Sequence, residues 1–249
     1  MNFSFEIVPR NHQAFDDQYS FVSSLGESIN MINVPDIQRF DNRSWETGKK
    51  IDRRTHQFVP HFRAIDFSLS SGKIFQIIED NELEHVLLVS GDPPEGIKRE
   101  FYNTNVIDLI RAVKQRFPNI TIHAGFDPHR NGIQDEFLYI QRKLDAGASS
   151  FFSQPFYDLR MIEIYAELMK EQDIETYIGL SPITTLPSMN YWALKNKVQF
   201  PTAFKADYEW NIEFSNRVID LGKEMAFNIY FMPIKINLAD YFGKLNLPK

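Results

Sequence analysis

The sequence predicts an α/β fold, a single (β/α)8 TIM barrel formed by residues 1–249 as one domain. Short segments rich in Val, Ile and Phe alternate with segments of helical hydrophobic spacing along the chain. Such alternation indicates parallel strands joined by crossover helices, and eight units in 249 residues fit a closed barrel. The alternative is an open doubly wound sheet. However, the loop after its first strand would read VPRNHQAF, which lacks the expected glycine-rich pattern.

The expected strands are short runs dominated by β-branched and aromatic residues. Continuous apolar runs of this length are typical of strands that are buried on both faces. In chain order they are FSFEIV (3–8), INMINV (29–34), QFVPHF (57–62), HVLLVS (85–90), ITIHAG (120–125), SSFFSQ (149–154), TYIGLS (176–181) and NIYFMP (228–233).

The expected helices show apolar residues on one face. In NVIDLIRAVKQRF (105–117), the apolar residues from Val106 to Phe117 fall near one side, while Arg111 and Lys114 point away. The same spacing predicts helices over DFSLSSGKIFQIIEDN (66–81), EFLYIQRKLDAG (136–147), LRMIEIYAELMKEQD (159–173) and EWNIEFSNRVIDLGKEM (209–225).

Composition and charge exclude several classes of function. The formal net charge is −6 and no run of Lys or Arg occurs, so the chain lacks the basic face that nucleic-acid binding normally needs. It contains no cysteine, which excludes disulfides and thiolate chemistry. The N-terminus lacks a signal-peptide pattern, and no stretch of about 18 apolar residues occurs. We therefore expect a cytoplasmic protein that does not insert into a membrane.

The barrel fold itself predicts where the functional residues lie. In such barrels the active site forms at the carboxyl ends of the strands and in the loops that follow them. Applied to the expected strands, this rule selects the polar residues Glu6, Asn33, Asp36, His61, Asp66, Ser90, Asp92, His123, Asp127, His129, Gln154 and Lys235.

Glu6 interrupts the first apolar strand. Because strand side chains alternate, either Glu6 and the residues at 4 and 8 face the barrel interior, or the apolar residues at 3, 5 and 7 do. An inward carboxyl group would have a raised pKa, stay protonated and suit general-acid catalysis. The alternative is a structural salt bridge to an arginine such as Arg10 or Arg63.

VSGDPPEG (89–96) combines a strand end with a tight turn. Gly91 would let the backbone approach a ligand closely, and Asp92 would be displayed at the rim, although the same composition is common in purely structural turns. The six histidines include no close pair at metal-ligand spacing, so we expect no metal site. Lys143 lies in the last turn of a helix, where a solvated cation interacting with the helix dipole is the simplest interpretation.

Five segments together resemble the methylenetetrahydrofolate reductase family, whose members are flavin-bearing (β/α)8 barrels. SFEIVPR (4–10) is similar to the family's Ser-Phe-Glu-aromatic-aromatic-Pro-Pro, VPHFRAID (59–66) to Pro-His-Leu-Thr, and LLVSGDPP (87–94) to Leu-Arg-Gly-Asp-x-Pro. FPNITIHAGFDPH (117–129) is similar to a strand that ends in Ala-x-Tyr-Pro-Glu-x-His. QRKLDAGASSFFSQPFYD (141–158) is similar to Lys-Arg-Lys-x-Asp-Ala-Gly-Ala followed by Thr-Gln-x-Phe-Phe-Asp. The five occur in the family's order over nearly the whole chain.

The resemblance implies an enzyme in which NADH or NADPH reduces bound FAD, which then reduces 5,10-methylenetetrahydrofolate to 5-methyltetrahydrofolate. It makes Glu6 the general acid that assists opening of the folate ring, and it places Asp92 beside the pterin and the flavin. Gln154 would contact the substrate and the nicotinamide, and Lys235 would lie near the glutamate tail of the folate. Flavin contacts are implied for Asn33, His61, Gly91, Asp92, Tyr102, Phe126, His129, Arg142 and Lys143, the last two near its phosphates.

The chain departs from the family pattern at several points. INVPD (32–36) replaces Thr-Tyr-Gly-Ala, Ser90 replaces the arginine before Gly-Asp, Phe126 replaces a tyrosine, and Asp-Pro-His replaces Pro-Glu-x-His. Each difference changes a flavin contact. Two alternatives therefore stay open: a folate-binding or methyl-transferring barrel that lacks flavin redox activity, and a non-catalytic subunit that needs a partner protein. With a barrel over residues 1–249 we expect no regulatory domain after it, and assembly as a homo-oligomer is compatible with the sequence.

Overall fold

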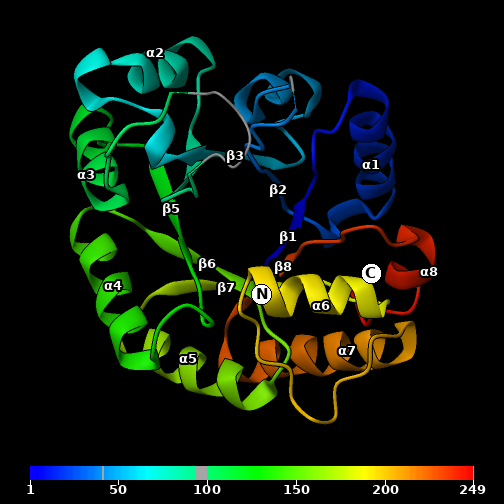
Figure 1. The fold of residues 1–249 in the computed structure, drawn as a ribbon. Coiled ribbons are helices and arrows are strands. Elements are labelled where there is room, and N and C mark those ends of the chain that lie inside the picture. Colours follow the sequence, from blue (N-terminus) through cyan, green and yellow to red (C-terminus); the bar gives the residue numbers. More distant parts are fainter. Residues whose placement is uncertain (41, 94–99, 249) are drawn as a thin grey trace.

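The computed structural model describes residues 1–40, 42–93 and 100–248, and its centre is a closed barrel of eight parallel strands (Figure 1). Each strand pairs with the next one in the chain, and β8 pairs with β1 to close the ring. The strands are β1 (Phe3–Glu6), β2 (Met31–Val34), β3 (Gln57–Arg63), β4 (His85–Val89), β5 (Thr121–Phe126), β6 (Ser150–Pro155), β7 (Glu175–Leu180) and β8 (Asn228–Phe231). This closure confirms the predicted (β/α)8 barrel and excludes the open sheet.

All eight expected strands are present, with ends that differ from the predicted ones by at most two residues. The described helices surround the barrel as a ring (Figure 1). They are α1 (His12–Ser24), α2 (Lys73–Asp80), α3 (Val106–Arg116), α4 (Ile133–Asp145), α5 (Leu159–Glu171), α6 (Leu186–Lys195), α7 (Tyr208–Met225) and α8 (Leu238–Phe242).

The helix predicted over residues 66–81 was wrong in its first half. Residues 69–71 form a 3₁₀ turn, and α2 begins only after Gly72, whose φ of 67° lies in the left-handed region. A left-handed residue cannot continue a right-handed helix, so the helical hydrophobic spacing of 66–72 is coincidental. Three helices, α1, α6 and α8, were not predicted. They bury few side chains, as α1 buries only Phe15 and Val22.

The orientation of β1 decides how Glu6 is used. Phe3, Phe5 and Ile7 belong to the main core between the strands and the surrounding helices, where each is at most 1% exposed. Glu6 therefore points the other way, into the barrel. A β1 turned by one residue would place the Glu6 carboxyl group in the apolar core between strands and helices and would push Phe3 and Phe5 into the already filled barrel interior, so it is disfavoured.

The barrel interior carries a second, smaller apolar cluster below its carboxyl end. Its members come from six different strands or their ends, and the ring of Phe152 stacks on that of Tyr177 with the centroids 4.2 Å apart. Tyr230 meets Phe152 edge to face at 5.1 Å. The cluster comprises Met31, Val59, Leu87, Phe152, Tyr177, Tyr230 and Met232. It fills the barrel and forms a closed base under its carboxyl end.

The strand β6 contains an irregularity that exposes one side chain. Phe152 pairs with Tyr177, but Pro155 pairs with Gly179, so one residue is inserted between the two pairings. The Gly179 N–H donates to Ser153 Oγ at 2.7 Å instead of to a strand carbonyl. Such a bulge redirects side chains. Ser153 is buried as a result, whereas Gln154 is exposed.

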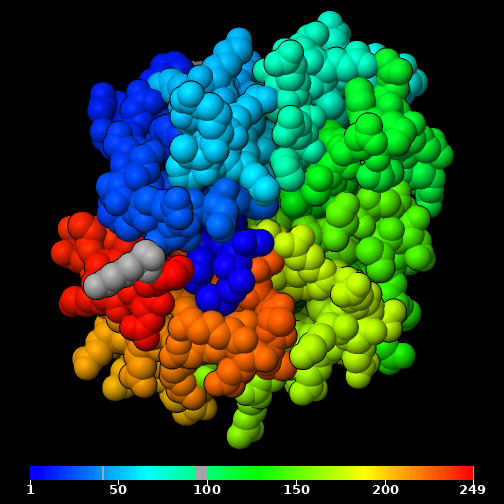
Figure 2. All heavy atoms as spheres, turned by 180° about the vertical axis from the view of Figure 1, so that it is seen from behind, coloured from blue at the N-terminus to red at the C-terminus, as the bar shows by residue number. Residues whose placement is uncertain are grey.

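The two ends of the barrel differ in how they are covered. In Figure 1 helix α6 crosses in front of the barrel, on the side where the strands end. Figure 2 shows the opposite face, where the first residues of the chain, in dark blue, lie near the centre beside orange residues of the C-terminal third. Among the described residues no helix is long and apolar enough to span a membrane.

Candidate active site

A cavity of about 340 Å³ opens at the carboxyl end of the barrel. Its volume falls at the lower end of the range for small-ligand sites. Apolar residues of the interior cluster form its base, and polar residues from the strand ends form its rim. The lining residues are Glu6, Pro35, His61, Leu87, Val89, Ser90, Gly91, Asp92, Gly125, Phe126, Asp127, His129, Arg130, Lys143, Phe152, Ser153, Gln154, Trp192, Asn196, Tyr230 and Met232.

Most of the predicted site residues lie together in this cavity. They are Glu6, His61, Gly91, Asp92, Phe126, His129, Lys143 and Gln154. Four others lie elsewhere. Asn33 is fully buried beneath His61, and Tyr102 and Arg142 line two neighbouring hollows. Lys235 is exposed in the loop after β8 and does not line the cavity.

Glu6 is bonded to a tyrosine from the other end of the chain. The Tyr230 hydroxyl donates a hydrogen bond to Glu6 Oε2 across the junction of β1 and β8. The carboxyl group is enclosed by protein, and burial raises its pKa from 4.5 to about 7, although the Tyr230 hydrogen bond opposes this rise. This contact overturns the alternative of a salt bridge to Arg10 or Arg63. A carboxyl group with this pKa can hold or release a proton near neutral pH.

His61 is held by a buried chain of polar side chains. Its Nε2 donates to Asn33 Oδ1 at 2.8 Å, and Asn33 Nδ2 donates in turn to Ser4 Oγ. Burial lowers the pKa of His61 to about 3, so the imidazole is neutral. Since Nε2 carries the proton, Nδ1 is left as a hydrogen-bond acceptor at the cavity.

The loop after β5 is fixed by one buried glutamate. Glu136 is 0% exposed, and its carboxylate accepts hydrogen bonds from the Asp127 backbone N–H, from Arg130 and from Asn131. His129 is held on the other side, since its Nε2 donates to the Pro155 carbonyl at 2.8 Å. These bonds fix Arg130 through Nη2 and His129 through Nε2, and they place both side chains at the rim of the cavity.

Lys143 is buried, contrary to the interpretation of a solvated lysine. Its Nζ donates to the Gly125 carbonyl at 2.6 Å and lies 4.0 Å from the ring centroid of Tyr139. Burial lowers its pKa from 10.5 to about 8, with a smaller effect of Arg130 in the same direction and opposing effects of Glu136 and Asp127. The side chain runs from the last turn of α4 back along the strand β5, as helical side chains lean towards the N-terminus.

The side of the cavity opposite β3 and β4 is covered by α6. Trp192, 7% exposed, and Asn196 reach the cavity from this helix and its C-cap. Trp192 packs in an aromatic and aliphatic cluster with Tyr157, Ile183 and Val198. This cluster anchors α6 over the barrel mouth and brings an indole ring to the cavity edge.

Several lining residues were missed by sequence reasoning. Tyr230 and Met232 were read only as parts of an apolar strand, and Trp192 lies in a helix that was not predicted. Arg130 stands directly after His129, so its position in the loop after a strand was the one signal that could have identified it. The other three carried no such signal.

Two hollows outside the main cavity bear on cofactor binding. One, lined by Arg130, Tyr139 and Arg142 among others, runs along α4 and shares Arg130 with the cavity. The other contains Tyr102 and Arg43 and lies beside the loops after β2 and β3. Within the described part of the chain, no group of three or more His, Asp or Glu side chains could hold a metal ion.

Comparison with solved structures supports the fold. The chain is similar to oxaloacetate acetylhydrolase in complex with oxalate, with a TM-score of 0.59, 10% identity, and coverage of 98% of this chain and 78% of that one. It is also similar to 2,3-dimethylmalate lyase, with a TM-score of 0.56, 10% identity, and coverage of 93% and 75%. At such low identity the likeness concerns the fold alone.

Comparison of sequences is more specific. Proteins named 5,10-methylenetetrahydrofolate reductase are 24% identical over 210 residues in Pectobacterium carotovorum, covering 81% of this chain and 70% of that protein, and 23% identical over 218 residues in Salmonella typhimurium, covering 84% and 74%. The Escherichia coli protein of that name is 24% identical over 156 residues, which cover 60% of this chain and about half (52%) of that protein. A family model described as methylenetetrahydrofolate reductase matches residues 3–230. The chain therefore belongs to the methylenetetrahydrofolate reductase family.

Proposed function

We propose that this protein is an NAD(P)H-dependent methylenetetrahydrofolate reductase. The balanced reaction consumes 5,10-methylenetetrahydrofolate, NAD(P)H and one proton, and it yields 5-methyltetrahydrofolate and NAD(P)⁺. The observation that carries the proposal is Glu6: an enclosed carboxyl group with a pKa raised to about 7, at the base of a cavity that also contains Asp92 and Gln154. This reaction requires such a group, because the substrate ring opens only with a proton.

The residues at the cavity would suit the flat ring system of FAD. The apolar base and the lining glycines Gly91 and Gly125 suit a flat ring system, and the hollow along α4 shares Arg130 with the cavity. Arg130, Arg142 and the Lys143 amine would hold the phosphates, since Arg130 lines both hollows, Lys143 lines the cavity and Arg142 lines the hollow along α4. When bound, FAD would accept a hydride from NADH or NADPH and supply one to the folate.

Glu6 would act as the proton donor to the folate. Near pH 7 about half of the Glu6 carboxyl groups carry a proton, as a pKa of about 7 implies. The proton would pass to the folate nitrogen that leaves the methylene carbon, which opens the five-membered ring to the reactive iminium. The Tyr230 hydroxyl would then stabilise the carboxylate that remains, because it donates to Glu6 Oε2.

Other residues would bind and orient the ligands. The Asp92 carboxylate stands at the rim, and Gln154 projects from the β6 bulge. An amide side chain offers a donor and an acceptor, which suits the pterin edge or the nicotinamide carboxamide. The indole of Trp192 would provide a face for stacking against either flat ligand. His61 would offer Nδ1 as an acceptor in the cavity.

The two half-reactions test this function directly. The purified protein, supplied with FAD, should show the visible absorption of oxidised flavin. Under anaerobic conditions NADH or NADPH should bleach it, and methylenetetrahydrofolate should restore it. In Glu6→Gln the bleaching should persist while the folate step slows by about 10²–10⁴-fold, the usual contribution of a general acid. Stopped-flow absorbance measures both steps.

Glu175→Gln is the matched control, because Glu175 also accepts a tyrosine hydroxyl but lies at the start of β7, the opposite end of the barrel. Both half-reactions should proceed in it. A colourless protein that gains no flavin and reduces no folate would contradict the proposed function and favour a folate-binding barrel without redox activity. An equal loss of both half-reactions in Glu6→Gln would contradict the general-acid assignment.

A further inference from the structure

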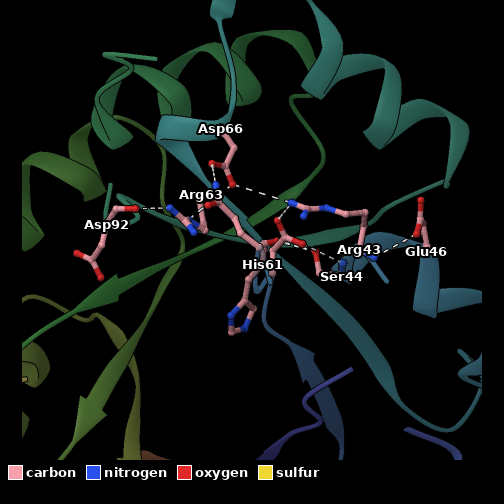
Figure 3. Close-up of polar contacts among 9 residues, drawn as sticks. Arg43, Ser44, Glu46, His61, Arg63, Asp66 and Asp92 are labelled. Atoms are coloured by element: carbon pink, nitrogen blue, oxygen red, sulfur yellow. Dashed lines mark hydrogen bonds and ion pairs between the residues drawn. The ribbon is translucent and has the colours of Figure 1, made fainter. Parts of the chain in front are cut away.

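The turn that carries Asp92 is held by an arginine from the neighbouring strand. Arg63 ends β3, and its Nη2 donates a hydrogen bond to the Asp92 carbonyl (Figure 3). The side chain also occupies the space next to Gly91. A Cβ atom at Gly91 would be 2.8 Å from Arg63 Nε and 2.9 Å from Arg63 Cβ. Gly91 has a φ of 79°, a conformation that favours glycine, so both backbone and space at this turn are adapted to the arginine.

The Arg63 guanidinium is itself positioned by the loops after β2 and β3. Its Nε lies 3.6 Å from Asp66 Oδ2 and forms no hydrogen bond. Asp66 Oδ1 accepts from Gln38 at 2.6 Å, and Asp66 Oδ2 is 4.0 Å from Arg43, which also pairs with the buried Asp36. Figure 3 shows Arg63 between Asp66 on one side and Asp92 on the other. Arg43 and Arg63 balance Asp36 and Asp66 in charge, and Asp92 joins this chain of contacts through its backbone carbonyl.

The family pattern explains why an arginine at this place is informative. The segments VPHFRAID and LLVSGDPP resemble family segments with threonine at the position of Arg63 and arginine at the position of Ser90. In this chain the arginine is Arg63, at the end of β3, and the small residue Ser90 directly follows β4. Arg63 and Val89 are paired in the sheet, so the ends of the two strands are adjacent. Ser90 Oγ is 3.4 Å from the Tyr139 hydroxyl, which leaves the space above Gly91 to Arg63.

We propose that Arg63 is a positioning residue that holds the Gly91–Asp92 turn so that the Asp92 carboxylate faces the cavity, and that an arginine placed at position 90 could hold the same turn from β4. The importance of that carboxylate for folate binding rests on the proposed function. The positioning of the turn by Arg63 does not rest on the proposed function, because it follows from the contacts of Arg63 alone. An arginine on either strand can perform this role, since a guanidinium carries several donors in a fixed fork.

The exchange of the two residues provides the test. Four proteins are compared: wild type, Arg63→Thr, the double variant Arg63→Thr with Ser90→Arg, and the control Arg111→Thr. Arg111 is an exposed arginine on α3 that pairs with Asp108, far from the cavity lining. The first measurement, made without ligand, is the ¹⁵N order parameter of the Gly91 and Asp92 amides. The second is the dissociation constant for 5-methyltetrahydrofolate.

In Arg63→Thr the order parameters of both amides should fall from about 0.85 towards 0.6 or below, and the dissociation constant should rise roughly tenfold to a hundredfold. The double variant should recover both values, and Arg111→Thr should match the wild type. Should Arg63→Thr not fold, Arg63→Lys replaces it. Lysine keeps a cation beside Asp66 but cannot reach the Asp92 carbonyl in the same geometry, so the same loss of order is expected.

Three outcomes would overturn the proposal: unchanged order parameters in the Arg63 variant, a loss that Ser90→Arg fails to restore, or a weaker affinity without any loss of order. The last would mean that Arg63 contacts the ligand directly. A wild-type protein that binds no 5-methyltetrahydrofolate, with order parameters that change and recover as described, would support the role of Arg63 and contradict the proposed function instead.

Discussion

Glu6 and Tyr230 lie 224 positions apart in the chain, yet a hydrogen bond joins them at the base of the cavity. Neither residue is unusual by itself. A glutamate in an apolar strand can be a general acid or half of a salt bridge, and a tyrosine in an apolar strand is usually part of a core. Their contact identifies the two residues as a pair, in which burial raises the pKa of the carboxyl group more than the hydrogen bond from the tyrosine hydroxyl lowers it.

Tyr230→Phe should raise the pKa of Glu6 above its present value of about 7. The hydrogen bond favours the ionised carboxylate, so its loss favours the protonated form. A net hydrogen bond to a charged group is worth about 1.5–3 kcal/mol, which corresponds to roughly one to two pH units. In the proposed mechanism the folate half-reaction needs protonated Glu6, so its rate should fall as pH rises through the pKa of Glu6. The pH at which this rate falls should therefore increase in the variant.

A structural effect of losing the hydroxyl is separated by a control. Tyr177→Phe removes a similar buried hydroxyl, which donates to Glu175 at 3.1 Å at the other end of the barrel. It should leave the pH profile in place. The pKa of Glu6 can also be measured in the absence of substrates. The infrared absorption of its carboxyl group is followed with pH, and the spectrum of Glu6→Gln is subtracted. A profile that stays fixed or moves to lower pH in Tyr230→Phe would refute the role of this hydrogen bond.

Besides Glu6 and Tyr230, the titratable or charged groups that face the cavity are His61, Asp92, Asp127, His129, Arg130 and Lys143.

At the scale of elements, the bulge in β6 places a polar side chain at the rim of the cavity. Ser153 turns inward and bonds to the Gly179 N–H, which frees Gln154 to project at the rim. The neighbouring strand β7 has a glycine, Gly179, beside the bulge, where a larger residue would not fit. A Cβ at Gly179 would lie 2.7 Å from the Ser153 carbonyl oxygen, 3.1 Å from that of Gln154 and 2.5 Å from the Met232 methyl group.

Gly179→Ala should destabilise the protein and weaken ligand binding together. The added methyl group meets backbone oxygens of the bulge, which can move only if β6 shifts, and overpacking of this kind costs typically about 1–3 kcal/mol. Denaturant unfolding measures the first effect, and the dissociation constant for 5-methyltetrahydrofolate measures the second. Gly132→Ala is the control, because its Cβ would meet nothing within 4 Å. Equal stability and affinity in the two variants would show that the bulge is not constrained by Gly179.

The elements also show where sequence reasoning succeeded. All eight strands were predictable because a strand of this barrel is buried on both faces and therefore reads as a continuous apolar run. Helices that bury a full stripe, such as α3 and α5, were equally clear. The missed helices α1, α6 and α8 bury few side chains and therefore show little apolar periodicity. The false start at 66–72 has a different cause, because its spacing is helical but the left-handed conformation of Gly72 interrupts the helix.

At the scale of the whole molecule, the enclosed Glu6 links stability to pH. Its pKa is about 7 in the folded protein and near 4.5 when unfolded, so the folded state binds the proton more tightly. The resulting stabilisation is fully present below pH 4.5, falls as pH rises towards 7, and is absent above that. Relative to Glu6→Gln, the free energy of unfolding of the wild type should decrease by roughly 1–3 kcal/mol over this interval.

Urea unfolding at several pH values between 4 and 8 measures this difference. Subtraction of the Glu6→Gln curve cancels the contributions of the other titrating groups, provided that the two proteins share them. A difference that is constant with pH, or that favours the wild type as pH rises, would show that the folded-state pKa of Glu6 is not raised.

The sequence by itself determined the barrel, the order of its strands and the identity of most residues at its carboxyl end. Those follow from local patterns, since apolar runs, turn residues and strand ends are properties of neighbouring positions. Only the tertiary structure decided which way Glu6 faces, that Tyr230 is its partner, that Lys143 is buried and that Arg63 reaches over to Asp92. These contacts join distant segments. They exist because closing the barrel makes β1 the neighbour of β8, and because long side chains cross from one strand end to the next.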